Sequence, residues 1–341
     1  MPIARHCWTS HLIDKMKEKL RIVYFGTPDF AVEPLRRLRE QENDECGYTI
    51  VGVVTMPDKI ITRRGSNQVL MSPVKEYAIE QNLPLLQPES LKNEEFIEAL
   101  AAWGADLQIV VAFRMLPEKV WNMPRLGTFN LHASLLPQYR GAAPINWAII
   151  NGDKVSGVTT FFLKHEIDTG DVIMQEKVEI TESDDAGTLH DKLMIVGGGT
   201  VVETVRAIVK GEAPARPQDT MHDGNLLPAP KIFRDTCRID WDKKCTELYN
   251  FVRGLSPHPA AWMEIADTEG NITSIKVYEA RKELCEVTHP QKTLLTDGKS
   301  YVKVALSDGY LHLTSLQIPG KKRMPTADLL RGFSFDNFKL V

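Results

Sequence analysis

The sequence has no run of about 18 consecutive apolar residues, the length that a membrane-spanning helix requires. Residues 1–20 lack a continuous apolar core followed by small residues, so no secretory signal peptide is expected. The five cysteines are odd in number, and none stands in a Cys-x-x-Cys pair. Neither a disulfide framework nor a zinc site is therefore indicated, and reduced thiols in a cytoplasmic protein fit this composition best.

Other sequence signatures are missing as well. No Gly-x-Gly-x-x-Gly motif, the signature of dinucleotide-binding enzymes, follows the first predicted strand. Three consecutive glycines at 197–199 follow no strand, and we expect them to kink or break a long helix predicted over 187–210. The 341 residues, of which 43% are hydrophobic and 25% charged, form an ordinary globular composition. This length exceeds what a single core usually supports, so two domains are expected.

Charge is distributed unevenly along the chain, although the formal net charge is only −4. Residues 225–341 contain 17 Lys and Arg against 14 Asp and Glu, which gives +3, and the remainder carries −7. A mildly basic C-terminal part on an acidic body permits a polyanionic partner. A solvated surface explains the same asymmetry about as well.

The N-terminal two thirds alternates between short apolar runs and helical patterns. The predicted strands are 20–25, 49–55, 83–87, 107–113, 129–132, 158–163 and 172–180, and the predicted helices include 28–41, 72–81, 93–103 and 141–151. Strands separated by helices imply parallel pairing through right-handed crossovers. The predicted class is α/β, with a Rossmann-like domain around a parallel central sheet. Residues 56–71 are interpreted as a polar loop.

The C-terminal third has a different pattern. Residues 211–231 are rich in Pro and Gly without periodicity, which is typical of a linker between domains. One helix near 245–253 and several alternating runs split by Asp, Gly and Asn turns then predict a small antiparallel β-barrel of the OB-like kind. The expected organisation is an N-terminal tail (1–19), a catalytic domain (20–210), the linker (211–231) and the barrel domain (232–341).

The residues with the clearest chemical potential lie between 127 and 171. Asn130 and His132 alternate with apolar residues in a predicted strand, so both project on the same face. The strand predicted over 158–163 ends in a polar turn that contains Asp168. An amide, an imidazole and a carboxylate can thus meet where two strands end, which is where open α/β sheets place their sites. Considered on its own, an Asn at such a position is more often a turn former, and a His at such a position is more often an interior side chain.

This segment resembles the folate-dependent formyltransferases. The resemblance rests on Asn130-Leu131-His132, Ser134-Leu135-Leu136-Pro137, Tyr139-Arg140-Gly141 and Ile167-Asp168-Thr169-Gly170-Asp171. It implies transfer of a formyl group from 10-formyltetrahydrofolate to an amine, a reaction that needs no metal. The resemblance assigns catalysis to Asn130, His132 and Asp168, and folate binding to Ser134, Leu135, Leu136 and Pro137.

The C-terminal part narrows the resemblance to formyltransferases that act on methionyl-tRNA. The segments concerned are Arg238-Ile239-Asp240-Trp241, the stretch 255–262 and the stretch 317–324. They imply initiator methionyl-tRNA as the acceptor, with contacts from Arg63, Arg64, Lys321, Lys322 and Arg323.

Relatives usually begin near Met16, so residues 1–15 are expected to be a dispensable tail or a mis-assigned start. A monomer without membrane attachment is also expected. Two alternatives remain open. One is a formyltransferase for a nucleotide-linked amino sugar, and the other is a non-catalytic folate- or RNA-binding protein.

Overall fold

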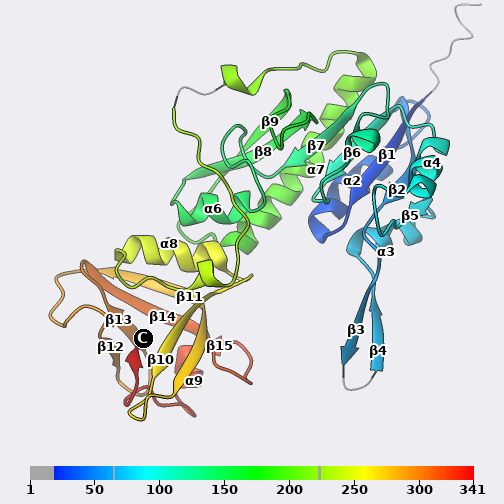
Figure 1. Ribbon diagram of the computed structural model, residues 1–341. Helices are drawn as coiled ribbons and strands as arrows, with labels where there is room; N and C mark the ends of the chain where they lie inside the picture. Colours follow the sequence, from blue (N-terminus) through cyan, green and yellow to red (C-terminus); the bar gives the residue numbers. More distant parts are fainter. Residues whose placement is uncertain (1–18, 64–65, 222–223) are drawn as a thin grey trace, which may run out of the picture. The chain divides into compact units, whose positions relative to one another are not determined.

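The computed structural model describes residues 19–63, 66–221 and 224–341 (Figure 1). Residues 1–18 of the expected tail (1–19) and the loop residue Arg64 lie outside the described residues. The chain divides into two compact units. The first contains the described residues up to His132 together with Thr159–Gln175 and Met194–Thr220, and the second contains Ala133–Val158, Glu176–Leu193 and the described residues from 221 onward.

A seven-stranded sheet has the order β5-β2-β1-β6-β7-β8-β9. Its strands are β1 (Leu20–Gly26), β2 (Tyr48–Val54), β5 (Leu85–Leu86), β6 (Leu107–Val111), β7 (Thr128–His132), β8 (Val155–Phe162) and β9 (Val172–Glu179). Pairing is parallel from β5 through β7 and antiparallel between β7 and β8. The predicted α/β class and parallel central sheet are confirmed, with an antiparallel extension beyond β7.

Helices connect the parallel strands as the periodicity predicts. They are η1 (Asp29–Ala31), α2 (Val32–Glu40), α3 (Pro73–Glu80), α4 (Glu94–Ala102) and α5 (Glu118–Trp121), followed by α6 (Pro144–Ile150) after β7. The sequence also explains where two of them begin. The side chains of Ser72 and Asn93 accept hydrogen bonds from the backbone N–H groups of Lys75 and Glu95, which would otherwise have no partner in the first helical turn.

The long helix α7 (Ala186–Lys210) runs without interruption through residues 197–199, so the expected break is wrong. Close packing explains why glycine is used here. A Cβ atom on Gly197 would lie only 2.8 Å from Cδ2 of Leu131. Glycine therefore lets α7 approach β7, the strand that carries Asn130 and His132, and this packing offsets the weak helix propensity of glycine.

The expected polar loop over 56–71 is a hairpin instead, formed by β3 (Lys59–Arg63) and β4 (Ser66–Leu70) (Figure 1). Ile60 and Val69 face each other across the hairpin and are 69% and 59% exposed. Because neither residue is buried, the usual alternation of buried and exposed positions gives no signal for these strands. At Ile60 and Val69 the two strands are held by backbone pairing, because neither side chain packs into a core.

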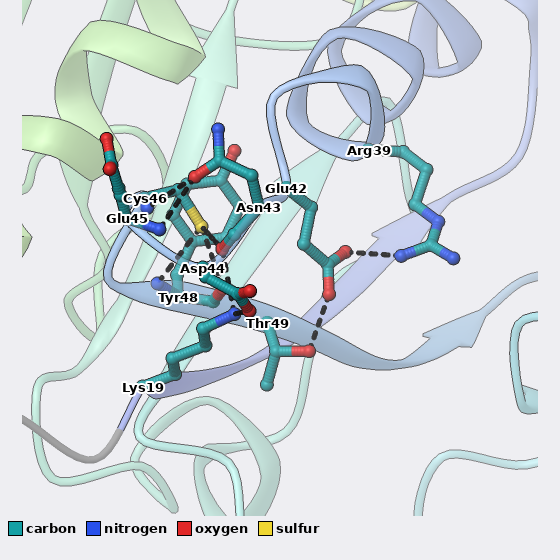
Figure 2. A network of polar contacts seen from close by, with 9 residues as sticks. All are labelled: Lys19, Arg39, Glu42, Asn43, Asp44, Glu45, Cys46, Tyr48 and Thr49. Carbon is teal, nitrogen blue, oxygen red and sulfur yellow. Dashed lines mark hydrogen bonds and ion pairs between the residues drawn. The ribbon is translucent and has the colours of Figure 1, made fainter.

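The turn between α2 and β2 is held by a network of polar contacts (Figure 2). Asn43 Oδ1 accepts hydrogen bonds from the backbone N–H groups of Glu45 and Cys46, both at 2.8 Å. Glu42 accepts a hydrogen bond of 2.6 Å from the Thr49 hydroxyl. These interactions give a polar segment a defined path into β2 by satisfying its backbone groups locally.

The C-terminal part forms the antiparallel barrel that the sequence predicts. Its strand order is β12-β13-β14-β11-β10-β16, with β15 beside β14. The strands are β10 (Ala261–Ala266), β11 (Ile272–Leu284), β12 (Leu294–Thr296), β13 (Val302–Ala305), β14 (Gly309–Gln317), β15 (Met324–Pro325) and β16 (Lys339–Leu340), and the helices are η3 (Asp235–Cys237), α8 (Cys245–Leu255) and α9 (Thr326–Leu329). Along β10, Ala261, Met263 and Ile265 are buried and alternate with partly exposed residues, so one face of the strand meets the core.

The segment expected to be a linker is hydrogen-bonded to other parts of the chain. Within the first unit it contains η2 (Gln218–Thr220), and Arg216 exchanges two backbone hydrogen bonds with Val172, at 2.8 and 3.0 Å. Within the second unit, Ala229 pairs with Gly141. Parts of this Pro- and Gly-rich segment are therefore fixed at defined places.

A buried polar cluster joins the turn before α7 to α8 within the second unit. Asp184, which is 5% exposed, forms an ion pair of 2.6 Å with Lys192. Arg253 of α8, which is 6% exposed, donates from Nη1 to the Asp184 carbonyl oxygen at 2.8 Å. Burial alone would raise the pKa of Asp184, but hydrogen bonds from Lys192 and Thr181 outweigh it and lower the pKa to about 2.

We expect Asp184→Asn to lower the free energy of unfolding by about 2 kcal/mol at pH 7. Because the folded-state pKa lies below the unfolded value, this stabilisation is present above about pH 4 and is lost as the pH falls through about 2. Urea titrations at pH 7 and pH 3 measure the difference. Asp191→Asn, at a mostly exposed carboxylate, is the control and should change stability by less than about 1 kcal/mol. An equal loss for Asp184→Asn at both pH values would contradict this account.

Candidate active site

Asn130 and His132 lie on β7, between β6 and β8 in the sheet. Their neighbours Phe129 and Leu131 are buried, and the pleat of the strand directs alternate side chains to opposite faces. His132 is 7% exposed and Asn130 is partly exposed. The strand thus presents an imidazole and an amide two residues apart, at the end where β7 leaves the sheet.

Asp168 lies in the turn between β8 and β9, and the structure brings it to His132. The distance between Asp168 Oδ2 and His132 Nδ1 is 3.9 Å, and both side chains are largely buried. This distance exceeds that of a direct hydrogen bond but is short enough for a strong electrostatic interaction. A carboxylate placed here can hold the orientation of the ring and stabilise positive charge that develops on it.

The turn that carries Asp168 has an unusual backbone. Asp168 itself has a φ of 55°, in the left-handed region that few non-glycine residues adopt. Two residues later, a Cβ atom on Gly170 would lie 1.5 Å from the carbonyl oxygen of Phe162, so only glycine fits. The amide of Gln218 donates to the carbonyl oxygens of Asp168 and Gly170, at 2.9 and 2.8 Å.

Gln218 is not among the site residues that the sequence predicts. The residue lies in the Pro- and Gly-rich segment where no periodicity marks buried positions, yet its side chain is 2% exposed. A polar residue flanked by Pro217 and Asp219 gives no signal that separates it from an ordinary linker residue.

Asn130 has a buried amide oxygen, Oδ1, with no hydrogen-bond partner among the described residues. A buried polar atom left in this state costs about 1–3 kcal/mol. A bound molecule can remove that cost by donating a hydrogen bond, or by accepting one if the amide rotates and presents its NH₂ group. The amide of Asn130 can therefore bind a polar group of a ligand beside β7.

The segment Ser134, Leu135, Leu136 and Pro137 follows β7 directly in the chain. Ser134 is fully buried, and its hydroxyl donates to the carbonyl oxygen of Gln138 at 2.6 Å. Leu136 and Pro137 are buried and Leu135 is partly exposed. The next residues are fixed as well, because the Tyr139 hydroxyl donates to Asp153 at 2.7 Å. Burial, followed by this hydrogen bond, raises the pKa of Tyr139 well above its ordinary value.

The basic residues expected to bind tRNA lie in different settings. The backbone of Arg63 pairs with Ser66 at the end of β3, whereas Arg64 is outside the described residues. Lys321 and Lys322 are exposed in the turn after β14.

Arg323, the third basic residue of that turn, is also exposed but has partners in the chain. It forms an ion pair with Glu279, donates to the Ser315 hydroxyl at 3.0 Å and lies 4.7 Å from the Tyr278 ring centroid. Its charge is thus partly compensated within the barrel, which distinguishes it from the two lysines.

Within residues 19–63, 66–221 and 224–341, no three His, Cys, Asp or Glu side chains converge in a way that could hold a metal ion. The helices of the same ranges include none that combines the length and the apolar character needed to cross a membrane.

Comparisons with known proteins show the family of the chain and its fold. The profile described as formyl transferase matches residues 19–205, and that of the formyl transferase C-terminal domain matches residues 231–334. HypX from Aquifex aeolicus, solved as a multiple variant, has the same fold over 93% of this chain and 49% of its own, with a TM-score of 0.60 and 18% identity.

Much more similar sequences come from Bacteroides. The methionyl-tRNA formyltransferase of Bacteroides thetaiotaomicron is 59% identical over 326 residues, which is 95% of this chain and 99% of the relative. That of Bacteroides fragilis is 59% identical over 93% of this chain and 96% of the relative. The resemblance seen in the sequence is thereby confirmed, and the chain belongs to the methionyl-tRNA formyltransferase family.

Proposed function

We propose that this chain transfers the formyl group of 10-formyltetrahydrofolate to the free amino group of methionyl initiator tRNA. The product would be N-formylmethionyl-tRNA, which serves translation initiation. The observation that carries the proposal is the approach of Asp168 to His132 beside the unpartnered amide oxygen of Asn130. The names of the relatives that are 59% identical support the same reaction and acceptor.

The reaction needs a neutral amine and a way to stabilise an oxyanion. An α-amine titrates near pH 8, so a fair share of it is already neutral near pH 7. The amine nitrogen forms a bond to the formyl carbon, the bond from that carbon to the folate nitrogen breaks, and one proton passes from the amine to that nitrogen. Negative charge gathers on the formyl oxygen during the attack.

The side chains on β7 can stabilise this charge. The amide NH₂ of Asn130 and an imidazole N–H of His132 are hydrogen-bond donors, and a well-placed donor to an oxyanion contributes about 3–4 kcal/mol. The orphaned amide oxygen of Asn130 fits a substrate group that carries an N–H, such as the attacking amine. Asp168 would orient the imidazole, or receive the amine proton through a water molecule.

The other parts of the proposal rest on the family. Ser134, Leu135, Leu136 and Pro137 would contact the folate. Residues 20–210 would form the formyl-transfer domain, 211–231 the linker and 232–341 a tRNA-binding barrel. Arg63 and Arg64 would lie near the acceptor end of the tRNA, with Lys321, Lys322 and Arg323 on its backbone. We further propose a cytoplasmic monomer, with residues 1–15 dispensable.

The acceptor can be tested directly. Purified protein is incubated with 10-formyltetrahydrofolate and either methionyl initiator tRNA or a nucleotide-linked amino sugar, and kcat/KM is compared. The proposal predicts a kcat/KM at least about 1000-fold higher with the charged tRNA. A higher value with the amino sugar would support the rival formyltransferase, and binding of folate or tRNA without turnover would support a non-catalytic protein.

We expect Lys321→Gln combined with Lys322→Gln to raise KM for tRNA and flatten its salt dependence. Each tRNA phosphate that the variant no longer neutralises should reduce the logarithmic salt slope by up to about one. Arg323→Gln alone should have a smaller effect, because Glu279 already pairs with this guanidinium. KM for 10-formyltetrahydrofolate should not change.

Lys299→Gln, at an exposed lysine in the turn between β12 and β13, is the matched control for this experiment. Salt titrations of tRNA binding are measured for each variant. If the double variant has the same logarithmic salt slope as wild type, this turn is not part of the tRNA-binding surface.

A further inference from the structure

The turn that carries Asp168 is tied to a residue fifty positions later in the chain. Gln218 Nε2 donates to the carbonyl oxygen of Asp168 at 2.9 Å and to that of Gly170 at 2.8 Å. Both acceptors are backbone atoms on either side of Thr169, so one amide group spans the turn. The side chain of Gln218 is 2% exposed, and these hydrogen bonds are therefore shielded from water.

The hydrogen bonds from Gln218 act on a turn whose backbone is strained and whose preceding residues are exposed. A non-glycine residue in the left-handed region, like Asp168 with its φ of 55°, raises the conformational energy by about 1–2 kcal/mol. The preceding residues 164–167 are all exposed and contribute no core packing. Within the turn, the Thr169 hydroxyl donates to the carbonyl oxygen of Glu166 at 3.0 Å, and Lys164 pairs with Asp171 at 2.7 Å. The two hydrogen bonds from Gln218 add a buried contact from another segment of the chain.

Gln218 is itself held in place by the backbone around it. Arg216 exchanges two hydrogen bonds with Val172, at 2.8 and 3.0 Å, and the short helix η2 starts at Gln218. The segment after α7 is thus attached to the first residue of β9, next to the turn that it supports. The backbone hydrogen bonds of Arg216 and the start of η2 thus hold Gln218 beside the turn that contains Asp168.

We infer that Gln218 is a positioning residue for formyl transfer, acting through Asp168. It fixes the backbone of the turn so that the Asp168 carboxylate stays 3.9 Å from the His132 imidazole. The role rests on the proposed function, in which Asp168 orients His132 or receives a proton. Without the two hydrogen bonds the turn relaxes from its left-handed conformation, and the carboxylate moves away from the ring.

The first test is Gln218→Met, which keeps the length and volume of the side chain but removes both donors. We expect kcat to fall about 10- to 100-fold, because a displacement of about 1 Å in a catalytic group has an effect of this order. KM for 10-formyltetrahydrofolate and for tRNA should change less than about threefold. If this variant fails to fold, Gln218→Asn replaces it, since the amide is retained but withdrawn by one methylene.

A matched control separates positioning from loss of stability. Thr204→Val removes a buried hydrogen bond of 2.8 Å between the hydroxyls of Thr204 and Thr160, in the same unit but not in the turn. Its melting temperature should fall while kcat stays within about twofold of wild type. A kcat for Gln218→Met that is likewise within about twofold would overturn the inference.

A double-mutant cycle tests whether Gln218 acts through Asp168. In an Asp168→Ala background, Gln218→Met should cause less than about a twofold further loss of kcat, because the group that it positions is already absent. The full 10- to 100-fold loss in that background would overturn the inference.

Wild-type activity separates this inference from the proposed function. If wild type transfers no formyl group to methionyl-tRNA, the proposed function fails. Hydrogen–deuterium exchange then tests separately whether the hydrogen bonds from Gln218 hold the turn. Faster exchange of residues 163–171 in Gln218→Met than in Thr204→Val would support the tie, and equal exchange would contradict it.

Discussion

Replacing Asn130 with alanine is expected to lower kcat for formyl transfer at least about 100-fold, and replacing His132 with alanine should have an effect of the same size. Each change removes a hydrogen-bond donor that would act on charge formed only in the transition state. Folding should be affected little for Asn130→Ala, because this side chain leaves an unsatisfied oxygen in the folded protein. Steady-state kinetics with saturating donor and charged tRNA give kcat for each variant.

Asn122→Ala is the control for this experiment, because Asn122 is an exposed amide at the end of α5 in the same unit. It should leave kcat unchanged. Near wild-type kcat in either Asn130→Ala or His132→Ala would show that the oxyanion assignment is wrong. A loss confined to KM would assign the residue to substrate binding.

Gly170→Ala should have an effect of similar or larger size, although glycine has no side chain that could act in the reaction. The added Cβ would lie 1.5 Å from the carbonyl oxygen of Phe162, well inside van der Waals contact. The turn must therefore move by more than about 1 Å, and Asp168 moves with it. We expect kcat to fall at least about 100-fold and the melting temperature to fall as well.

Gly332→Ala is the matched control, because a Cβ at that position would meet nothing within 4 Å. It should leave both kcat and the melting temperature near the wild-type values. Wild-type kcat in Gly170→Ala would mean that the position of the turn does not matter for the reaction.

The sequence predicts the regular parts of the fold well, because their patterns reflect burial. β6 reads Leu-Gln-Ile-Val-Val and is buried at every position, as a central parallel strand should be. The alternation of β10 likewise marks one face toward the barrel core. Capping residues at Ser72 and Asn93 place two helix starts within a residue of the structure.

The features that the sequence does not predict have little to do with burial periodicity. The hairpin of β3 and β4 exposes apolar residues at positions where a strand pattern would bury them. The helix α7 continues through Gly197, and the close approach of this residue to the Leu131 side chain has no signal in the sequence. Gln218 acts on two backbone carbonyl groups, and a side chain with that task has no characteristic spacing.

The candidate site is predicted from the sequence only in part. Strand alternation places Asn130 and His132 on one face, the polar turn after the next strand supplies Asp168, and the family resemblance assigns catalysis to all three. The distance of 3.9 Å between Asp168 and His132 then depends on a left-handed turn and a glycine fit that spacing alone does not define.

The most direct test of the central claim is a single-turnover reaction with 10-formyltetrahydrofolate labelled in its formyl group. Enzyme is in excess over methionyl initiator tRNA, and the amino acid is released from the tRNA afterwards for identification. The account predicts that label enters N-formylmethionine in a 1:1 ratio to the tetrahydrofolate formed, as group transfer requires. Label found only in formate, or none leaving the folate while the tRNA is bound, would contradict it.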